Sequence, residues 1–142
     1  MILPDVNVLI YAFRSDASQH ARCRAWLDKV VAGDEAFGIS PLSLAAVVRV
    51  TTNRRSYPVA SALEEAFAFG EDLIAQPHCQ LVTPGARHWD VFRNLCIDTE
   101  TRGGDTTDAW YAALAIEWGC EWITLDREYA RFPGLKWSAP QA

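Results

Sequence analysis

Short apolar runs alternate along the chain with longer segments whose apolar residues recur at helical spacing. Residues 1–5 (MILPD) predict a first strand that ends in a carboxylate, and residues 6–13 (VNVLIYAF) are compatible with a helix after it. Residues 36–39 and 79–82 are two further strand candidates, and residues 121–125 (EWITL) form the clearest strand-like run. The tail segment FPGLKW can add one more short strand.

Five helices are predicted between these strands, and several carry start or stop signals. Ser40-Pro41 is typical of an N-cap followed by the first helical residue, and Ser61 with Glu64 matches a capping box. Gly33 and Pro77 suit the ends of two of the helices. The predicted helices cover residues 18–31, 42–52, 61–76, 86–101 and 107–119.

Strands that alternate with helices favour an α/β fold with a mostly parallel sheet. The 142 residues are enough for one domain around one core, and we expect a single domain over residues 1–142. No apolar run approaches the ~18 residues of a membrane span, and the N-terminus lacks a basic leader. The four cysteines are scattered, which favours reduced thiols and a cytoplasmic protein.

The net charge of −5 does not by itself favour a nucleic-acid partner. However, all thirteen basic residues except Lys29 and Lys136 are arginines, which make bidentate contacts with phosphate. An acidic site that binds a cation would also account for part of the negative charge. Composition therefore leaves the class of partner open.

Three carboxylates have positions that suit a functional site. Asp5 follows the first strand and Asp126 follows the strand-like run 121–125, while Asp108 lies in the first turn of a helix. Sites in open α/β sheets form beyond the carboxyl ends of the strands, and a helix N-terminus favours a negative charge. If the first strand and the 121–125 strand are neighbours, all three acids can meet at one edge of the sheet.

Clustered carboxylates repel one another and need a cation among them, and their hard oxygen atoms suit Mg²⁺ or Mn²⁺. Such a site polarises phosphate and activates water, which is the chemistry of phosphodiester hydrolysis. Asn7 and Thr124 are placed to hydrogen-bond an acid or a water nearby. Taken one at a time, each acid also fits an ordinary turn or cap position, so the hypothesis rests on their conjunction.

Three segments resemble the motifs of PIN domains. MILPDVNVLIYAF is similar to the opening motif, GISPLSLAAVVRVTTN to the second, and TTDAWYAALAIEWGCEWITLDREYARFPGL to the third and fourth. The last segment is the most specific, with an Asp-Ala helix, a glycine, a strand, a T-x-D sequence and F-P-G-L. The resemblance spans essentially the whole chain and is strongest to the VapC-type toxins of VapBC toxin–antitoxin pairs.

The resemblance implies a Rossmann-like α/β/α sandwich and an endoribonuclease that depends on Mg²⁺ or Mn²⁺. It implies that Asp5, Asp108 and Asp126 are the acidic ligands and catalytic residues, with Asn7 and Thr124 as polar supports. It also implies an RNA substrate, a homodimer, and a VapB-type antitoxin that silences the acidic pocket. Water would attack the phosphorus in line and leave 5′-phosphate and 3′-hydroxyl ends.

The chain departs from the family pattern at one position. PIN nucleases usually have a glutamate in the second motif, and Ala46 stands there in this sequence. The chain can be a natural variant with three acids, the reading that the smooth pattern of the surrounding helix favours. Alternatively Asp105 substitutes for the glutamate, or the alanine reflects a loss of activity. The last reading makes the protein a catalytically weakened or inactive PIN-fold binding module.

The candidates for binding the RNA backbone are arginines that flank the motifs. Scattered surface charge is the alternative interpretation of each. They are Arg14, Arg49, Arg54, Arg55 and Arg102.

Two other classes of small α/β protein with acidic pockets do not fit the sequence. A phosphorelay receiver domain has adjacent acids after its first strand and a late lysine, whereas Val6 follows Asp5 here and the lysines are Lys29 and Lys136. A haloacid-dehalogenase phosphatase has a D-x-D motif, whereas this chain reads Asp5-Val6-Asn7.

Overall fold

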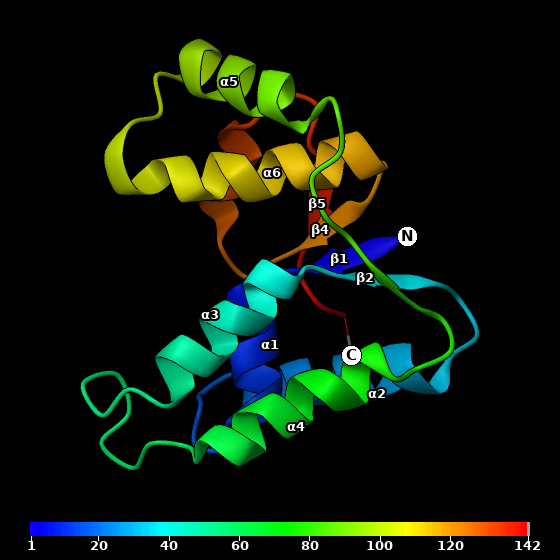
Figure 1. The fold of residues 1–142 in the computed structure, drawn as a ribbon, viewed down its shortest axis with the longest axis vertical. Helices are drawn as coiled ribbons and strands as arrows, with labels where there is room; N and C mark the ends of the chain where they lie inside the picture. Colours follow the sequence, from blue (N-terminus) through cyan, green and yellow to red (C-terminus); the bar gives the residue numbers. More distant parts are fainter. Residues whose placement is uncertain (142) are drawn as a thin grey trace.

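A five-stranded parallel sheet forms the centre of the protein, with the strand order β3-β2-β1-β4-β5 (Figure 1). The structure is a computed structural model, and it describes residues 1–141. All strands are short, and the predicted α/β class with a parallel sheet is confirmed. The strands are β1 (Ile2–Pro4), β2 (Phe37–Ile39), β3 (Cys79–Leu81), β4 (Glu121–Ile123) and β5 (Trp137–Ser138).

The helices occupy the segments that the sequence predicted, with small differences at their ends. They are α1 (Val6–Phe13), α2 (His20–Ala32), α3 (Pro41–Thr51), α4 (Leu63–Ile74), α5 (His88–Thr99) and α6 (Thr106–Trp118). Two short 3₁₀ turns, η1 (Gly103–Asp105) and η2 (Arg127–Arg131), precede α6 and follow β4. Gly119 ends α6 in the left-handed conformation, with a φ of 66°, which glycine adopts at little cost.

The pairing of β1 with β4 positions the site. These parallel neighbours align Pro4 with Ile123, and the backbone N–H of Asp5 donates to the carbonyl of Ile123 at 2.8 Å. Asp5 and Thr124 are therefore the first residues beyond the paired ends of two adjacent strands. The neighbouring arrangement that the sequence hypothesis required is confirmed.

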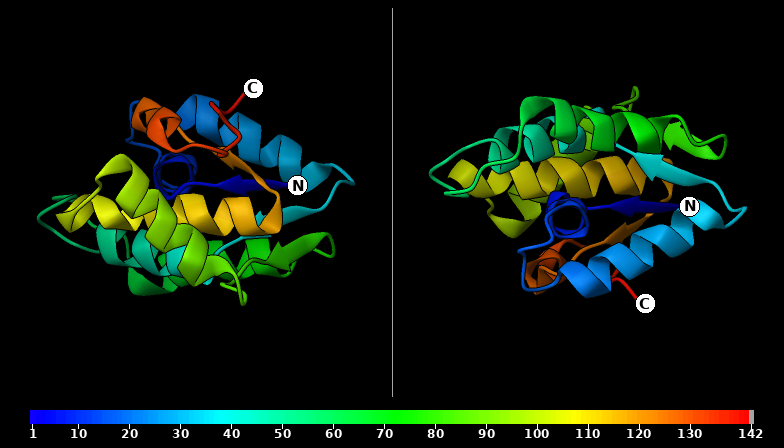
Figure 2. Two further views of the ribbon diagram at one scale, coloured as in Figure 1. Left: turned by 90° about the horizontal axis from the view of Figure 1, so that it is seen from above. Right: turned by 90° about the horizontal axis from the view of Figure 1, so that it is seen from below.

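Helices cover both sides of the sheet, and a separate apolar core fills each side. Figure 1 shows α5 and α6 on one side of the strands and α1 to α4 on the other, and Figure 2 gives the views from above and below. The first core joins Leu3 and Trp122 to the alanine-rich helix α6, whose small side chains allow close packing. The second core joins Phe37, Ile39 and residues of α1.

Two local predictions need correction. The capping box at Ser61 is wrong: α4 begins at Leu63, and the Ser61 hydroxyl accepts a hydrogen bond from Arg14 instead. β4 ends at Ile123, so Thr124 lies beyond it. The partner of a capping hydroxyl is decided by tertiary neighbours, which a local sequence pattern does not report.

Two general features complete the fold. The four cysteines are free thiols, of which Cys23 and Cys120 are buried. Among residues 1–141, no helix is both long enough and apolar enough to cross a membrane.

Candidate active site

Asp5 is the most buried carboxylate of the site, with 7% of its surface exposed. It is the N-cap of α1, where Oδ1 accepts a hydrogen bond from the N–H of Val6 at 2.6 Å. Its other oxygen, Oδ2, accepts from the hydroxyl of Thr124 at 2.6 Å. The end of β1 and the start of α1 therefore hold this carboxylate in one orientation.

Thr124 connects Asp5 to Asp126. The Thr124 side chain is fully buried, and its hydroxyl also accepts a hydrogen bond from the N–H of Asp126 at 3.0 Å. Asp126 is the N-cap of η2, and its Oδ1 accepts from the N–H of Glu128 at 2.9 Å. One hydroxyl therefore contacts the carboxylate of Asp5 and the backbone of Asp126.

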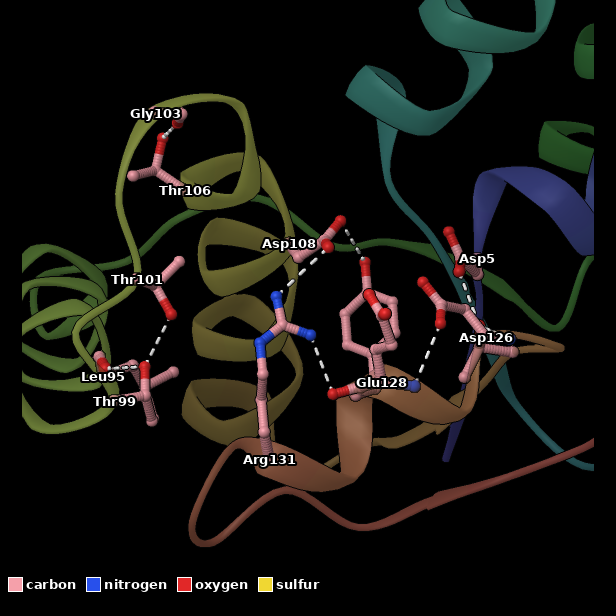
Figure 3. Close-up of polar contacts among 12 residues, drawn as sticks. Asp5, Leu95, Thr99, Thr101, Gly103, Thr106, Asp108, Asp126, Glu128 and Arg131 are labelled. Carbon is pink, nitrogen blue, oxygen red and sulfur yellow. Dashed lines mark hydrogen bonds and ion pairs between the residues drawn. The ribbon is translucent and has the colours of Figure 1, made fainter.

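Asp108 lies in the first turn of α6 and is held by two residues of η2. Its Oδ1 accepts a hydrogen bond from the Tyr129 hydroxyl at 3.2 Å, and its Oδ2 lies 3.3 Å from Nη2 of Arg131. Figure 3 shows these contacts together with those of Asp5 and Asp126. The middle and the end of η2 therefore contact Asp108, and Asp126 caps the start of the same turn.

The charges of the other two motif acids act on Asp5. The pKa of Asp5 is raised from 3.8 to about 6, mainly by burial and to a smaller extent by the charges of Asp108 and Asp126, while the hydrogen bonds from Thr124 and Val6 act to lower it. Burial, with the nearby negative charges of Asp5 and Asp108, also raises the pKa of Tyr129. An ionised Asp5 is therefore poorly compensated, which favours the approach of a cation.

Asn7 and Asp105, the other predicted supports, differ in their placement. Asn7 follows Asp5 by two residues. Its Oδ1 atom is buried and has no hydrogen-bond partner within residues 1–141. Asp105 is exposed at the start of α6, and only Asp108 and Asp126 among the acids act on Asp5. Asp105 is thus not among the acids whose charges raise the pKa of Asp5.

The helix α3 presents Ala46 towards the same region. Ser43, Ala46 and Arg49 follow one another at three-residue steps and share a helix face. The charges of Arg49 and Asp5 both act on Tyr111, whose pKa is raised mainly by burial. The Ser43 hydroxyl is buried beside Tyr111, but no hydrogen bond of good geometry joins them. Ala46, which is 9% exposed, lies between Ser43 and Arg49 on this face of α3.

The candidate arginines fall into two groups. Arg14 is occupied within the chain: its guanidinium pairs with Asp16, donates to Ser61 and lies 4.3 Å from the centre of the Tyr57 ring. With 11% of its side chain exposed, it has little surface left for RNA. The others are exposed and form no ion pair within residues 1–141, and they are Arg49, Arg54, Arg55 and Arg102.

The donor chemistry of this site fits a hard divalent cation. It offers carboxylate oxygens, a desolvated Asp5 and the unpartnered Asn7 Oδ1, and oxygen ligands of this kind suit Mg²⁺ or Mn²⁺. As they stand, no three His, Cys, Asp or Glu side chains in residues 1–141 are grouped closely enough to hold a metal ion. Both oxygens of Asp108 are instead engaged by Tyr129 and Arg131.

Sequence reasoning missed Tyr129 and Arg131. Both lie in the segment Asp126–Arg131, which has no periodic apolar pattern although it belongs to the stretch that resembles the last PIN motifs. The available signal was Asp126 as a cap: an aspartate that begins a tight turn directs the residues three to five positions later back towards the same edge of the sheet.

Sequence comparisons connect this geometry to known proteins. Residues 2–135 match the PIN domain family. The chain is 39% identical over 140 residues to Ribonuclease VapC43 of Mycobacterium tuberculosis (strain ATCC 25618 / H37Rv), with 99% of this chain and 95% of that protein covered. It is 40% identical to Ribonuclease VapC25 of the same strain, with 99% of both covered.

Solved structures of more distant sequence share the fold. VapBC2 from Rickettsia felis, bound to a DNA fragment from its promoter, superposes with a TM-score of 0.70 at 16% identity and covers 98% of both chains. The Mycobacterium tuberculosis toxin VapC20, which cleaves the sarcin-ricin loop, gives a TM-score of 0.67 at 12% identity over 95% of this chain and 98% of that one. The family match and the full-length relatives together establish that this chain belongs to the PIN domain family, in the group that contains the VapC ribonucleases.

Proposed function

We propose that this protein is a divalent-cation-dependent endoribonuclease and the toxin of a VapBC-type toxin–antitoxin pair. The observation that carries the proposal is the placement of Asp5, Asp108 and Asp126 at one edge of the sheet, where burial and the other two acids leave the charge of Asp5 uncompensated. The full-length similarity to proteins named VapC ribonucleases supports the choice of RNA as substrate.

The residues of the site have distinct roles in this proposal. Asp5, Asp108 and Asp126 hold Mg²⁺ or Mn²⁺, which supplies Lewis-acid activation of a phosphodiester and of water. Thr124 orients Asp5 and Asp126 through its hydroxyl. Among the exposed arginines, Arg49 has the strongest case as a phosphate contact, because it acts on Tyr111 together with Asp5.

The proposal includes partners and a location. The solved VapBC complexes support a VapB-type antitoxin as the inhibitor. We also propose a homodimer, which light scattering of the purified protein tests, and a cytoplasmic location, where the RNA substrates are. The rival function, an inactive PIN fold that serves only as a binding module, rests on Ala46 alone and has less support from the named relatives.

RNA cleavage by the purified, antitoxin-free protein tests the proposal. We expect cleavage of total bacterial RNA with Mg²⁺ or Mn²⁺, none with EDTA, and fragments that carry 5′-phosphates. Asp5→Asn and Asp126→Asn should each lower the rate at least ~100-fold. Asp34→Asn is the matched control, because Asp34 is exposed just before β2 at the opposite edge of the sheet.

Two outcomes would contradict the proposal. Cleavage that persists in EDTA or in both site variants would exclude the acids as the catalytic group. A protein that binds RNA but does not cleave it under any metal condition would favour the binding module. In cells, expression of the wild type and not of Asp5→Asn should arrest growth, and co-expression of the antitoxin should restore it.

A further inference from the structure

Arg131 is the one cation that contacts a motif acid within residues 1–141. Its Nη2 lies 3.3 Å from Oδ2 of Asp108, and its Nη1 donates to the carbonyl of Glu128 at 2.7 Å. The guanidinium also lies 4.2 Å from the centre of the Phe132 ring. These contacts fix the charged group beside Asp108, and Figure 3 shows the guanidinium between Asp108 and Glu128.

The pair between Arg131 and Asp108 is suited to exchange. Each side chain is 30% exposed, and the N–O separation is long for a charge-assisted hydrogen bond. Solvent-exposed ion pairs of this kind contribute little net free energy, because water competes for both groups. A divalent cation carries twice the charge of a guanidinium and can also approach Asp5 and Asp126, so it should displace Arg131 from Asp108.

We propose that Arg131 takes the place of the divalent cation on Asp108 in the resting protein and moves to a phosphate of the RNA when the cation binds. This inference rests on the proposed function, and Arg131 is a substrate-binding and positioning residue in it. The guanidinium can leave Asp108 while keeping its contact with the Glu128 carbonyl, because the two bonds use different nitrogens. The freed Nη2 then lies beside the cation, where a scissile phosphate would be held.

The structure therefore predicts opposite effects of one substitution on two ligands. Arg131→Gln removes the competing charge, so it should tighten the binding of Mn²⁺, measured by isothermal titration calorimetry without RNA, about threefold to tenfold. The same variant should weaken the binding of a fluorescein-labelled single-stranded RNA in Ca²⁺ by about tenfold, measured by anisotropy with the RNA checked for integrity on a gel.

Two further variants make the comparison specific. Arg127→Gln removes the same charge from the same turn, but Arg127 is exposed and has no carboxylate contact within residues 1–141, so both affinities should change less. Arg131→Lys keeps the charge and loses the planar fork. It should keep the wild-type affinity for Mn²⁺ while losing part of the affinity for RNA. Thermal melts of all variants establish that each is folded.

The outcomes separate this inference from the proposed function. If the wild type binds Mn²⁺ and cleaves RNA, but Arg131→Gln binds Mn²⁺ no more tightly than Arg127→Gln, the competition is wrong and the nuclease assignment stands. If Arg131→Gln binds Mn²⁺ more tightly but leaves the affinity for RNA unchanged, Arg131 does not move to the RNA. A wild-type protein that neither binds Mn²⁺ nor cleaves RNA overturns the nuclease proposal, and the competition with it.

Discussion

The hydroxyl of Thr124 donates a hydrogen bond of 2.6 Å to Oδ2 of Asp5, across the boundary between β4 and β1 and 119 residues apart in sequence. The same hydroxyl accepts from the N–H of Asp126. One buried side chain therefore holds the carboxylate of Asp5 and the backbone of Asp126, two acids of the proposed cation site. Because Asp5 is desolvated, its ionised form lowers the stability of the fold and favours the binding of a cation.

Asp5→Asn should stabilise the cation-free protein at neutral pH. The pKa of Asp5 is raised in the folded state from 3.8 to about 6, so the folded state binds a proton more tightly than the unfolded one. Its contribution to stability is therefore present at low pH and is lost as the pH rises through that window. The raised pKa corresponds to a cost of at most ~3 kcal/mol in the free energy of unfolding at pH 7.5. Removing the charge should recover only ~1–2 kcal/mol of it, because the asparagine amide has a donor where the carboxylate has a second acceptor.

Urea unfolding in EDTA at pH 7.5 and at pH 4 measures this effect. The gain should shrink or reverse at pH 4, where the wild-type Asp5 is already protonated. Mn²⁺ should then stabilise the wild type and not Asp5→Asn at pH 7.5. Asp34→Asn, on the exposed surface, serves as the control. An Asp5→Asn protein that is less stable than the wild type at pH 7.5 would show that Asp5 is well compensated in the fold.

Thr124→Val should lower stability and weaken cation binding together. Valine keeps the shape of the buried side chain but loses the donor to Asp5 and the acceptor for Asp126. Hydrogen bonds to charged groups contribute about 1.5–3 kcal/mol, so we expect a loss of about 2 kcal/mol at pH 7.5 in urea unfolding. Thr124→Ser keeps the hydroxyl and should retain the wild-type affinity for Mn²⁺. Equal affinities of the valine and serine variants for Mn²⁺ would show that the Thr124 hydroxyl does not orient the cation site.

Ala46→Glu should strengthen the proposed cation site. Ala46 shares a helix face with Ser43 and Arg49, on the side of α3 near Tyr111 and Asp5. A carboxylate there adds a fourth acid, and we expect Mn²⁺ to bind about fivefold more tightly, which corresponds to about 1 kcal/mol. Calorimetry measures the affinity, and Ala45→Glu, at an exposed position of the same helix, is the control. A variant no better than this control would show that position 46 does not reach the cation.

Gly38→Ala tests the packing of the sheet independently of the site. A Cβ atom at Gly38 would lie 2.6 Å from Cγ2 of Val82, a fully buried side chain, so a neighbour must move. Overpacking of this kind costs about 1–3 kcal/mol, which urea unfolding resolves. Gly104→Ala is the control, because nothing lies within 4 Å of its Cβ position. Equal stabilities of the two variants would mean that β2 and the segment after β3 pack less tightly than the structure shows.

Most of the fold could be predicted from local patterns. The run Met1–Asp5, the Ser40-Pro41 pair and Gly119 each mark an element boundary through chemistry that acts within a few residues, and the structure places strand or helix ends there. The capping box at Ser61 failed because the hydroxyl is used by Arg14, which is 47 residues away. Local signals are reliable until a distant partner competes for the same atom.

Local patterns along the chain specify the order of strands and helices and put Asp5, Asp108 and Asp126 at their ends, because propensity, periodicity and capping depend on near neighbours. Folding alone brings β1 beside β4, the Thr124 hydroxyl to Asp5, and Arg131 to Asp108. The residues of each pair lie far apart along the chain. Their contact depends on strand order and on the direction of one short turn, which no local pattern encodes.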